Sequence, residues 1–150
     1  MVGIAFYFEE NDKDVYSGRR IDLDAWNYAI KLAGDVDEVI IVNKTDTILR
    51  SPDHDLKSFN VVDELPELSG VVAHVVCPWD KKPQQKVPLW KCNHNVDWYV
   101  FGPAAGWDAT QEIISLGVFI PQNGIGALHA VHAATVIMAH RFGVLSWQLQ

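Results

Sequence analysis

Residues 118–142 of the 150-residue chain read VFIPQNGIGALHAVHAATVIMAHRF. The first three residues are a short apolar run of the kind that forms a buried strand. The next six hold a proline and two glycines, which predicts a tight loop. From about Ala127 to Phe142 apolar side chains recur at helical spacing, which predicts a helix. A buried strand, a glycine-rich loop and a helix in direct succession are typical of an α/β protein with a parallel sheet.

The same alternation of strands and helices continues upstream. A helix is expected from Asp22 or Asp24 to Leu32, because an aspartate can cap its first turn. Apolar runs predict strands at 2–8, 36–42, 59–62, 71–76, 96–101 and 118–120. Between them we expect a brief helix or turn at Pro66–Gly70, a flexible loop at 78–88 and a short helix at 110–116. No repeat or long linker interrupts this order, so residues 1–150 are predicted to form a single domain. Its sheet should be mostly parallel, with helices on both faces.

The charge balance is acidic. The chain has 19 Asp and Glu against 12 Lys and Arg, a formal net charge of -7, which disfavours a stand-alone nucleic-acid binder. A local basic patch is still compatible with it, and residues 78–88 hold three lysines and three prolines. Two cysteines are too few for a disulfide framework, and no apolar run approaches the roughly 20 residues of a membrane span. We therefore expect a soluble, cytoplasmic protein.

Two loops that follow predicted strands are rich in small residues: GPAAGW at 102–107 and PQNGIG at 121–126. In open parallel sheets, ligands bind beyond the carboxyl ends of the strands. Small residues let a ligand approach the backbone closely, although ordinary turn chemistry explains the same residues. No Walker A sequence is present. His129 also interrupts a possible G-x-G-x-x-G motif, which argues against nucleotide hydrolysis and dinucleotide binding.

These two loops carry a resemblance to a known family. GPAAG at 102–106 and IPQNGIGALHAVHAA at 120–134 resemble the second and third motifs of the SpoU/TrmH branch of the SPOUT methyltransferases. The segment Leu65–Gly70, which leads into the strand at 71–76, resembles the part that precedes those motifs. The resemblance covers about Val2 to Phe142. It implies the α/β trefoil knot, in which the last helix passes through a loop, and a homodimer.

The resemblance also implies a function. Enzymes of this family transfer a methyl group from S-adenosylmethionine to RNA, often to a ribose 2′-hydroxyl. Such a site mainly orients the acceptor oxygen and helps to remove its proton. The RNA would be recognised by the dimer surface or by a partner protein. Carried over by position, the cofactor would be lined by Phe101, Gly102, Gly106, Ile120, Gln122, Gly124 and Leu128.

Several polar positions of the family motifs are altered. Pro103-Ala104 stands where the family usually has Asn-Glu, and ALH at 127–129 replaces Ser-Leu-Asn. An alternative function is therefore a catalytically degenerate SPOUT-fold protein that acts as a cofactor- or partner-binding module. A second alternative is a flavodoxin-like small-molecule binder without a knot.

The candidate catalytic residues are Arg19, Arg20 and His129. One of the two arginines is expected to face the site, because a guanidinium can hold a phosphate through two hydrogen bonds, although a solvated loop arginine is the alternative. His129 is the candidate general base, because an imidazole pKa near 6.5 suits proton removal at neutral pH. No recognised metal-ligand spacing is present, and we expect no metal.

Two further expectations concern the last helix and the tryptophans. The core stripe of the helix is predicted to be Leu128, Val131, Thr135, Met138 and Phe142. The residues expected to extend it into a dimer interface are Ala130, Ala133, Ala134 and Ile137. Trp79 and Trp90 bracket the basic stretch, where they could stack a base, with burial in the core or dimer as the alternative.

Overall fold

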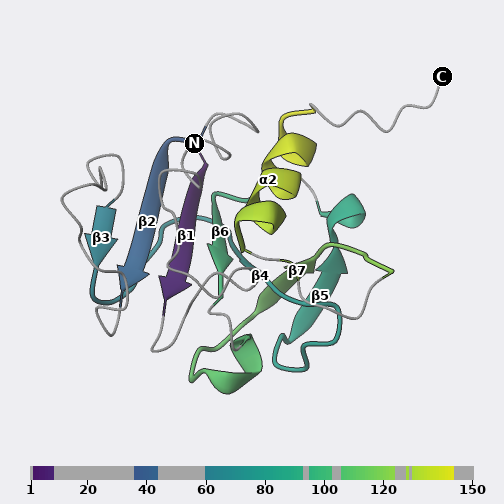
Figure 1. Ribbon diagram of the computed structural model, residues 1–150, viewed down its shortest axis with the longest axis horizontal. Coiled ribbons are helices and arrows are strands. Elements are labelled where there is room, and N and C mark those ends of the chain that lie inside the picture. Colours follow the sequence, from purple (N-terminus) through teal and green to yellow (C-terminus); the bar gives the residue numbers. More distant parts are fainter. Residues whose placement is uncertain are drawn as a thin grey trace, which may run out of the picture.

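The computed structural model describes residues 2–8, 36–43, 60–92, 95–102, 106–123, 128 and 130–143. Figure 1 shows the elements that these residues form. The strands are β1 (Gly3–Phe8), β2 (Glu38–Asn43), β3 (Asn60–Val62), β4 (Val72–Val75), β5 (Gln85–Pro88), β6 (Trp98–Phe101) and β7 (Leu116–Phe119). The helices are α2 (Ala130–Arg141) and two short 3-10 helices, η2 (Leu89–Lys91) and η3 (Trp107–Ala109).

The seven strands form one sheet in the order β3-β2-β1-β6-β4-β7-β5, and every neighbouring pair is parallel. The predicted α/β class with a mostly parallel sheet is therefore confirmed. In Figure 1 the sheet runs from β3 on the left to β5 on the right, and α2 lies near its centre. The helix expected over residues 22–32 lies outside the described residues.

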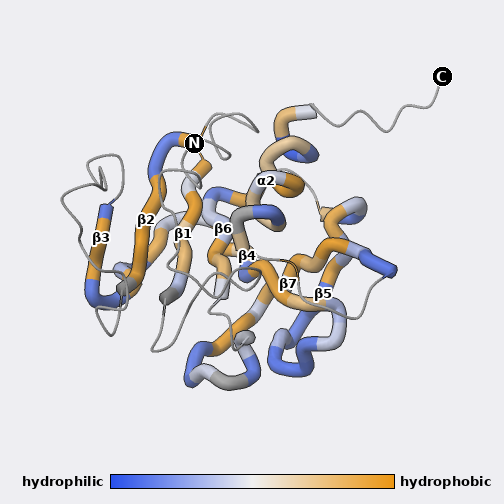
Figure 2. Tube along the Cα trace, viewed as in Figure 1, coloured by the Kyte–Doolittle hydropathy of each residue, from blue (hydrophilic) through white to orange (hydrophobic). Residues whose placement is uncertain are grey.

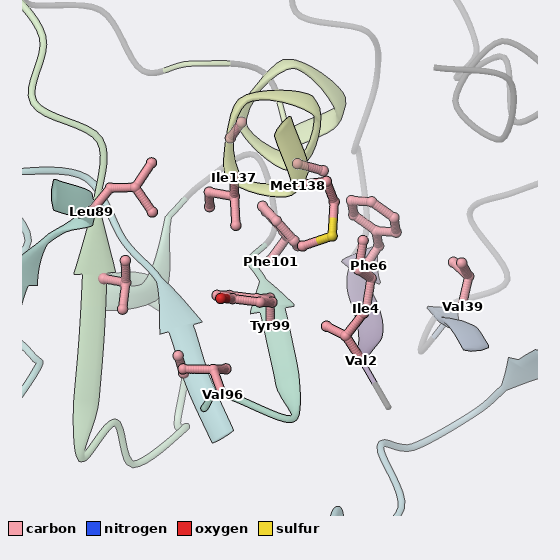
Figure 3. Packing of buried hydrophobic residues seen from close by; sticks show 14 of the residues in the cluster. Val2, Ile4, Phe6, Val39, Leu89, Val96, Tyr99, Phe101, Ile137 and Met138 are labelled. Atoms are coloured by element: carbon pink, nitrogen blue, oxygen red, sulfur yellow. The ribbon is translucent and has the colours of Figure 1, made fainter. Parts of the chain in front are cut away.

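One face of the sheet is covered by α2. Side chains alternate between the two faces of a strand, so every second residue of β1 and β6 points toward the helix. In Figure 3, Ile137 and Met138 point from α2 toward Tyr99, Phe101 and Phe6. The Phe6 and Phe101 rings stack with their centroids 5.1 Å apart. All five side chains are buried, so this face forms an apolar core.

The opposite face has a second core that is rich in aromatic rings. Its buried residues are Ala5, Tyr7, Ile40, Val42, Val76, Trp98, Val100, Trp107 and Ile114. Trp98 packs directly over Gly3, where a Cβ would come within 2.5 Å of the Trp98 ring. The two cores lie on the two sides of one sheet, which is the layered arrangement of α/β proteins.

The structure corrects the prediction that residues 78–88 form only a loop. Gln85–Pro88 is β5, which pairs in parallel with β7. A lysine and a proline are tolerated there because β5 is an edge strand, where the outward N–H groups need no partner in the sheet. The preceding residue also joins this pairing, since the Gln84 N–H donates to the Ile114 carbonyl over 2.9 Å.

The prediction of a short helix at 110–116 is also wrong, because these residues are not helical. The backbone N–H groups of Gln84 and Gln85 donate to the carbonyls of Ile114 and Ser115, which draws this segment into extended pairing. Ile114 is thereby buried on the opposite face. The turn or helix expected at Pro66–Gly70 is an irregular segment whose last residue, Gly70, has φ of +88°.

The predicted core stripe of the last helix is rotated from the observed one. Leu128 and Phe142 are 39% and 42% exposed, whereas Ala134 and Ile137 are fully buried, and Met138 lies in the core as predicted. The alanines face the sheet because their small side chains let the helix approach it closely. The residues expected to contact a second copy are therefore used within the chain itself.

The helix begins later than predicted, at Ala130, and Leu128 is not helical. The predicted knot would involve the connections around 103–105 and 124–127, which lie outside the described residues. No helix among the described residues is both long and apolar enough to cross a membrane.

Candidate functional site

The carboxyl ends of β6, β4 and β7 lie side by side. Val75 of β4 pairs with Phe101 of β6 on one side and with Val118 of β7 on the other. Because the strands are parallel, the segments that follow them emerge at one edge of the sheet. The two loops singled out in the sequence therefore begin on either side of β4. The turn that follows β4, Cys77–Asp80, lies between them, and motif spacing alone does not reveal this strand order.

The loop after β6 is anchored by Trp107. This side chain is 1% exposed, and its indole Nε1 donates to the Val75 carbonyl over 2.7 Å. Its ring also packs on Gly102, where a Cβ would lie 2.8 Å from Trp107 Cε2. The loop is thus held at Gly102, directly after the strand, and again at Trp107. The sequence placed Trp107 at the end of this loop but did not predict that its ring packs on Gly102.

Polar groups surround Trp107 on its other sides. Its ring makes edge-to-face contacts with Tyr7 at 5.4 Å and with His74 at 5.1 Å between centroids. The Tyr7 hydroxyl donates to Glu112 Oε1 over 2.9 Å. Burial lowers the pKa of His74, and the Glu112 carboxylate opposes that shift. These contacts link β1, β4 and the segment before β7 to the ring that anchors the loop.

Gly106 gives the site open space. Its φ is +86°, a conformation that glycine adopts without strain, and a Cβ there would meet no atom of the described residues within 4 Å. Outside the strand ladders, no hydrogen bond within the described residues involves the backbone of Gly102, Gly106 or Ile120. This edge therefore offers free backbone groups and room beside them, which suits a ligand held by main-chain contacts.

The turn after β4 is fixed by a buried carboxylate. Asp80 is 6% exposed; its Oδ2 accepts the Cys77 N–H over 2.8 Å, and its own N–H donates to the Cys77 carbonyl. Burial raises the pKa of Asp80, and the Asp108 charge raises it further. Burial, followed by Asp80 and Asp108, also raises the pKa of the Cys77 thiol to about 11. Cys77 is therefore a protonated thiol at neutral pH and a poor nucleophile.

Two of the three lysines in the basic stretch are used internally. The Lys86 Nζ donates to the carbonyls of Pro78 and Asp80 over 2.6 and 3.0 Å. The Lys82 Nζ donates to the Thr110 carbonyl. The Asp108 carboxylate accepts the backbone N–H groups of Lys81 and Lys82. The stretch therefore ties the β4 turn to η3, and only the Lys81 ammonium has no such role in the described part of the chain.

The predicted lining residues that the structure describes lie at or just beyond the carboxyl ends of β6 and β7, or just before α2. Gly102 and Gly106 belong to the β6 loop, and the half-buried Ile120 and Gln122 follow β7. The side chain of Phe101 is 2% exposed in the α2 core, so only its backbone could reach a ligand. Leu128 is 39% exposed just before α2.

The remaining predicted site residues, Arg19, Arg20, Gly124 and His129, lie outside the described residues. Of the base-stacking pair proposed from the sequence, Trp90 contacts His140 of α2, with ring centroids 5.4 Å apart, and Trp79 lies in the β4 turn. Within the described ranges, no group of three or more His, Cys, Asp or Glu side chains is placed to hold a metal ion.

Comparisons with known proteins agree with this architecture. No protein-family model matches the chain, and no curated protein does. Among solved structures, the chain is similar to the SpoU methyltransferase AviRb from Streptomyces viridochromogenes, with a TM-score of 0.53 and 15% identity over 93% of this chain. It spans 58% of the length of AviRb. It also matches a protein whose structure concerns 2-OH methylation of C/U34 on tRNA, with a TM-score of 0.54, 12% identity and 95% coverage of both chains.

These similarities define the class of fold. The chain has the fold of the SpoU-like RNA methyltransferases, as its loop motifs indicated. At 12–15% identity the likeness establishes the fold alone.

Proposed function

We propose that this protein is an S-adenosylmethionine-dependent RNA methyltransferase. The observation that carries the proposal is the arrangement of the β6 and β7 loops on either side of β4, in a chain with the SpoU-like fold. A ribose 2′-hydroxyl is the acceptor we favour, because one structural neighbour is described by 2-OH methylation of tRNA.

The described residues fit a cofactor held mainly by backbone groups. The backbones of Gly102, Gly106 and Ile120 would hold it, and the open space at Gly106 would admit it. When bound, S-adenosylmethionine supplies an activated methyl group. The chain would then orient the acceptor and move its proton, roles we assign to His129 and to Arg19 or Arg20. Gln122, Gly124 and Leu128 complete the proposed lining.

Calorimetric titration with S-adenosylmethionine tests this proposal most directly. Gly106→Ala would place a methyl group in the open space, and we expect cofactor affinity to fall at least about tenfold. Gly143→Ala is a matched control, because Gly143 also has positive φ and open space around it but follows α2. It should leave cofactor affinity unchanged. Absence of binding by the wild type at millimolar cofactor would overturn the proposal.

The second candidate function is a catalytically degenerate SPOUT-fold binding module. Two observations favour it: Pro103-Ala104 replaces the usual polar pair, and Lys82 and Lys86 use their amines inside the chain. A methyl-transfer assay with S-adenosylmethionine and bulk tRNA separates the two candidates. Cofactor binding with no transfer supports the binding module, and transfer that His129→Ala abolishes supports the enzyme.

We further propose a homodimer, whose surface or a partner protein would recognise RNA, in the cytoplasm. Trp90 and Phe142 are 46% and 42% exposed at the carboxyl end of α2, and such rings gain stability when a partner covers them. This surface replaces the alanines first expected at the interface. A monomer in light scattering at micromolar concentration would overturn the dimer.

A further inference from the structure

The turn Cys77–Asp80 presents a large aromatic ring to solvent. Trp79 is 47% exposed, although its neighbour Asp80 is buried. The Asp80 N–H donates to the Cys77 carbonyl over 3.0 Å, which closes a β-turn with Pro78 and Trp79 at its centre. Proline suits the first central position because its φ is already fixed. The ring is therefore carried by a rigid turn.

Hydrogen bonds from three side chains, those of Asp80, Lys86 and Asp108, hold this turn and the residues that follow it. The Lys86 amine bonds the carbonyls on both sides of Trp79, those of Pro78 and Asp80. The Asp80 carboxylate bonds back to the Cys77 N–H, and the residues that follow are held by Asp108 of η3. A fixed backbone lowers the entropy that the Trp79 ring would lose on contact with a ligand.

The position of the turn connects it with the proposed site. It follows β4, which lies between β6 and β7, so it emerges at the same edge as the two glycine-rich loops. Figure 2 shows that the connection from β4 to β5 is mostly hydrophilic. The other large apolar side chains exposed among the described residues belong to other segments: Val71, Trp90, Ile113, Leu128 and Phe142.

We propose that Trp79 is a stacking platform for one unpaired base of an RNA substrate, with the Lys81 ammonium contacting a neighbouring phosphate. This inference rests on the proposed function and adds a substrate contact to it. A single exposed ring, two residues before a lysine whose ammonium has no partner among the described residues, fits a base and its phosphate, because stable protein interfaces need a larger patch of about 800 Å² per partner. Trp79 and Lys81 together would also let a chain of net charge -7 bind RNA, because they use one aromatic ring and one lysine rather than a large basic surface.

The test is a fluorescence-anisotropy titration of a labelled ten-nucleotide oligouridylate at low salt, with the 150-residue chain. Trp79→Ala should weaken binding about 5- to 150-fold, the range measured for loss of one base–aromatic stack. Trp79→Phe keeps a ring and should remain within about threefold of the wild type. Lys81→Gln should flatten the salt dependence by the equivalent of one phosphate contact, a slope change of about 0.7. Val71→Ala is the control for loss of an exposed apolar side chain, since Val71 is 41% exposed and precedes β4, at the opposite end of that strand from the turn, and it should bind as the wild type does.

The outcomes separate this inference from the proposed function. Equal affinity of the wild type and Trp79→Ala for the oligonucleotide would overturn the inference even if cofactor binding and methyl transfer are intact. A Trp79-dependent affinity would support it even if calorimetry finds no cofactor binding. A change of oligomeric state in Trp79→Ala, with RNA affinity unchanged, would identify a protein contact and would also overturn the inference. Far-UV circular dichroism checks that each variant is folded.

Discussion

The two faces of the sheet are covered by different kinds of side chain. On the α2 face, Phe6, Phe101 and Met138 pack in a core that is almost wholly apolar. On the opposite face, Tyr7, Trp98 and Trp107 bring polar atoms into a buried layer. There the ring nitrogens His74 Nδ1 and Trp98 Nε1 are buried without a hydrogen-bond partner within the described residues. An unsatisfied buried polar atom costs about 1–3 kcal/mol, so this face contributes less stability for its buried area.

This difference separates stability from positioning. The α2 face holds the helix to the sheet through shape and hydrophobic area. The opposite face holds Trp107, and through it the loop that begins at Gly102, by directed contacts from Tyr7, His74 and the Val75 carbonyl. Substitutions on the α2 face should therefore reduce global stability, and substitutions around Trp107 should act mainly on the loop.

The largest effect is expected from Ala134→Glu on the α2 face. Ala134 is fully buried, so the variant would place an unpaired carboxylate in an apolar core. We expect a loss of more than about 4 kcal/mol in the free energy of unfolding, a large part of the stability of a typical domain. Urea denaturation followed by circular dichroism measures it. Gln111→Glu, which adds the same charge at an exposed position, should stay within about 0.5 kcal/mol. If Ala134→Glu is instead folded and monomeric while the wild type is a dimer, that result would support the interface predicted from the sequence.

That correction shows where sequence reasoning reaches its limit. The strands at 2–8, 36–42, 71–76 and 96–101 were predictable because short, mostly apolar runs are typical of strands buried on both sides of a sheet. The face of α2 was not, because the helix is apolar almost all around and its periodicity does not select one direction. The sheet determines which face of α2 is buried, because the small alanine side chains fit closely against it.

The site was likewise predictable from the sequence only in part. The small residues at 102–106 and 121–126 marked two loops, and the structure brings both to one edge of the sheet. Strand β5 and the braced turn Cys77–Asp80 were missed, because their order depends on pairing with distant segments. A proline- and lysine-rich stretch is typical of a loop unless the edge position of its strand is known.

A smaller effect, local to the loop, is expected from Gly102→Ala. The new Cβ would lie 2.8–3.0 Å from three atoms of the Trp107 indole, so the ring or the loop must move. We expect a cost of about 1–3 kcal/mol in unfolding free energy, with weaker cofactor binding. Trp107→Phe removes the indole nitrogen that donates to Val75 and should cost a similar amount.

The double variant Gly102→Ala/Trp107→Phe tests whether the two residues are in direct contact. Phenylalanine lacks the indole Nε1 that crowds the alanine, so Gly102→Ala in the Trp107→Phe background should cost less than in the wild type. A coupling energy of at least about 0.5 kcal/mol by urea denaturation supports direct contact. Strict additivity would mean that Trp107 does not hold Gly102, and that the loop is positioned by other groups.

The smallest effect concerns pH and His74. Because burial lowers the pKa of His74, the unfolded chain binds its proton more readily than the folded chain does. The free energy of unfolding should therefore fall as the pH drops below the ordinary value of 6.5, by at most about 1.4 kcal/mol per pH unit for one group. Glu112 faces His74 and opposes the shift, so Glu112→Gln should steepen the dependence while the amide oxygen still accepts the Tyr7 hydroxyl. His74→Phe should flatten it. Urea denaturation of the three proteins between pH 5 and 7.5 measures the slopes, and identical slopes in the wild type and His74→Phe would remove His74 from the pH response of the Trp107 face.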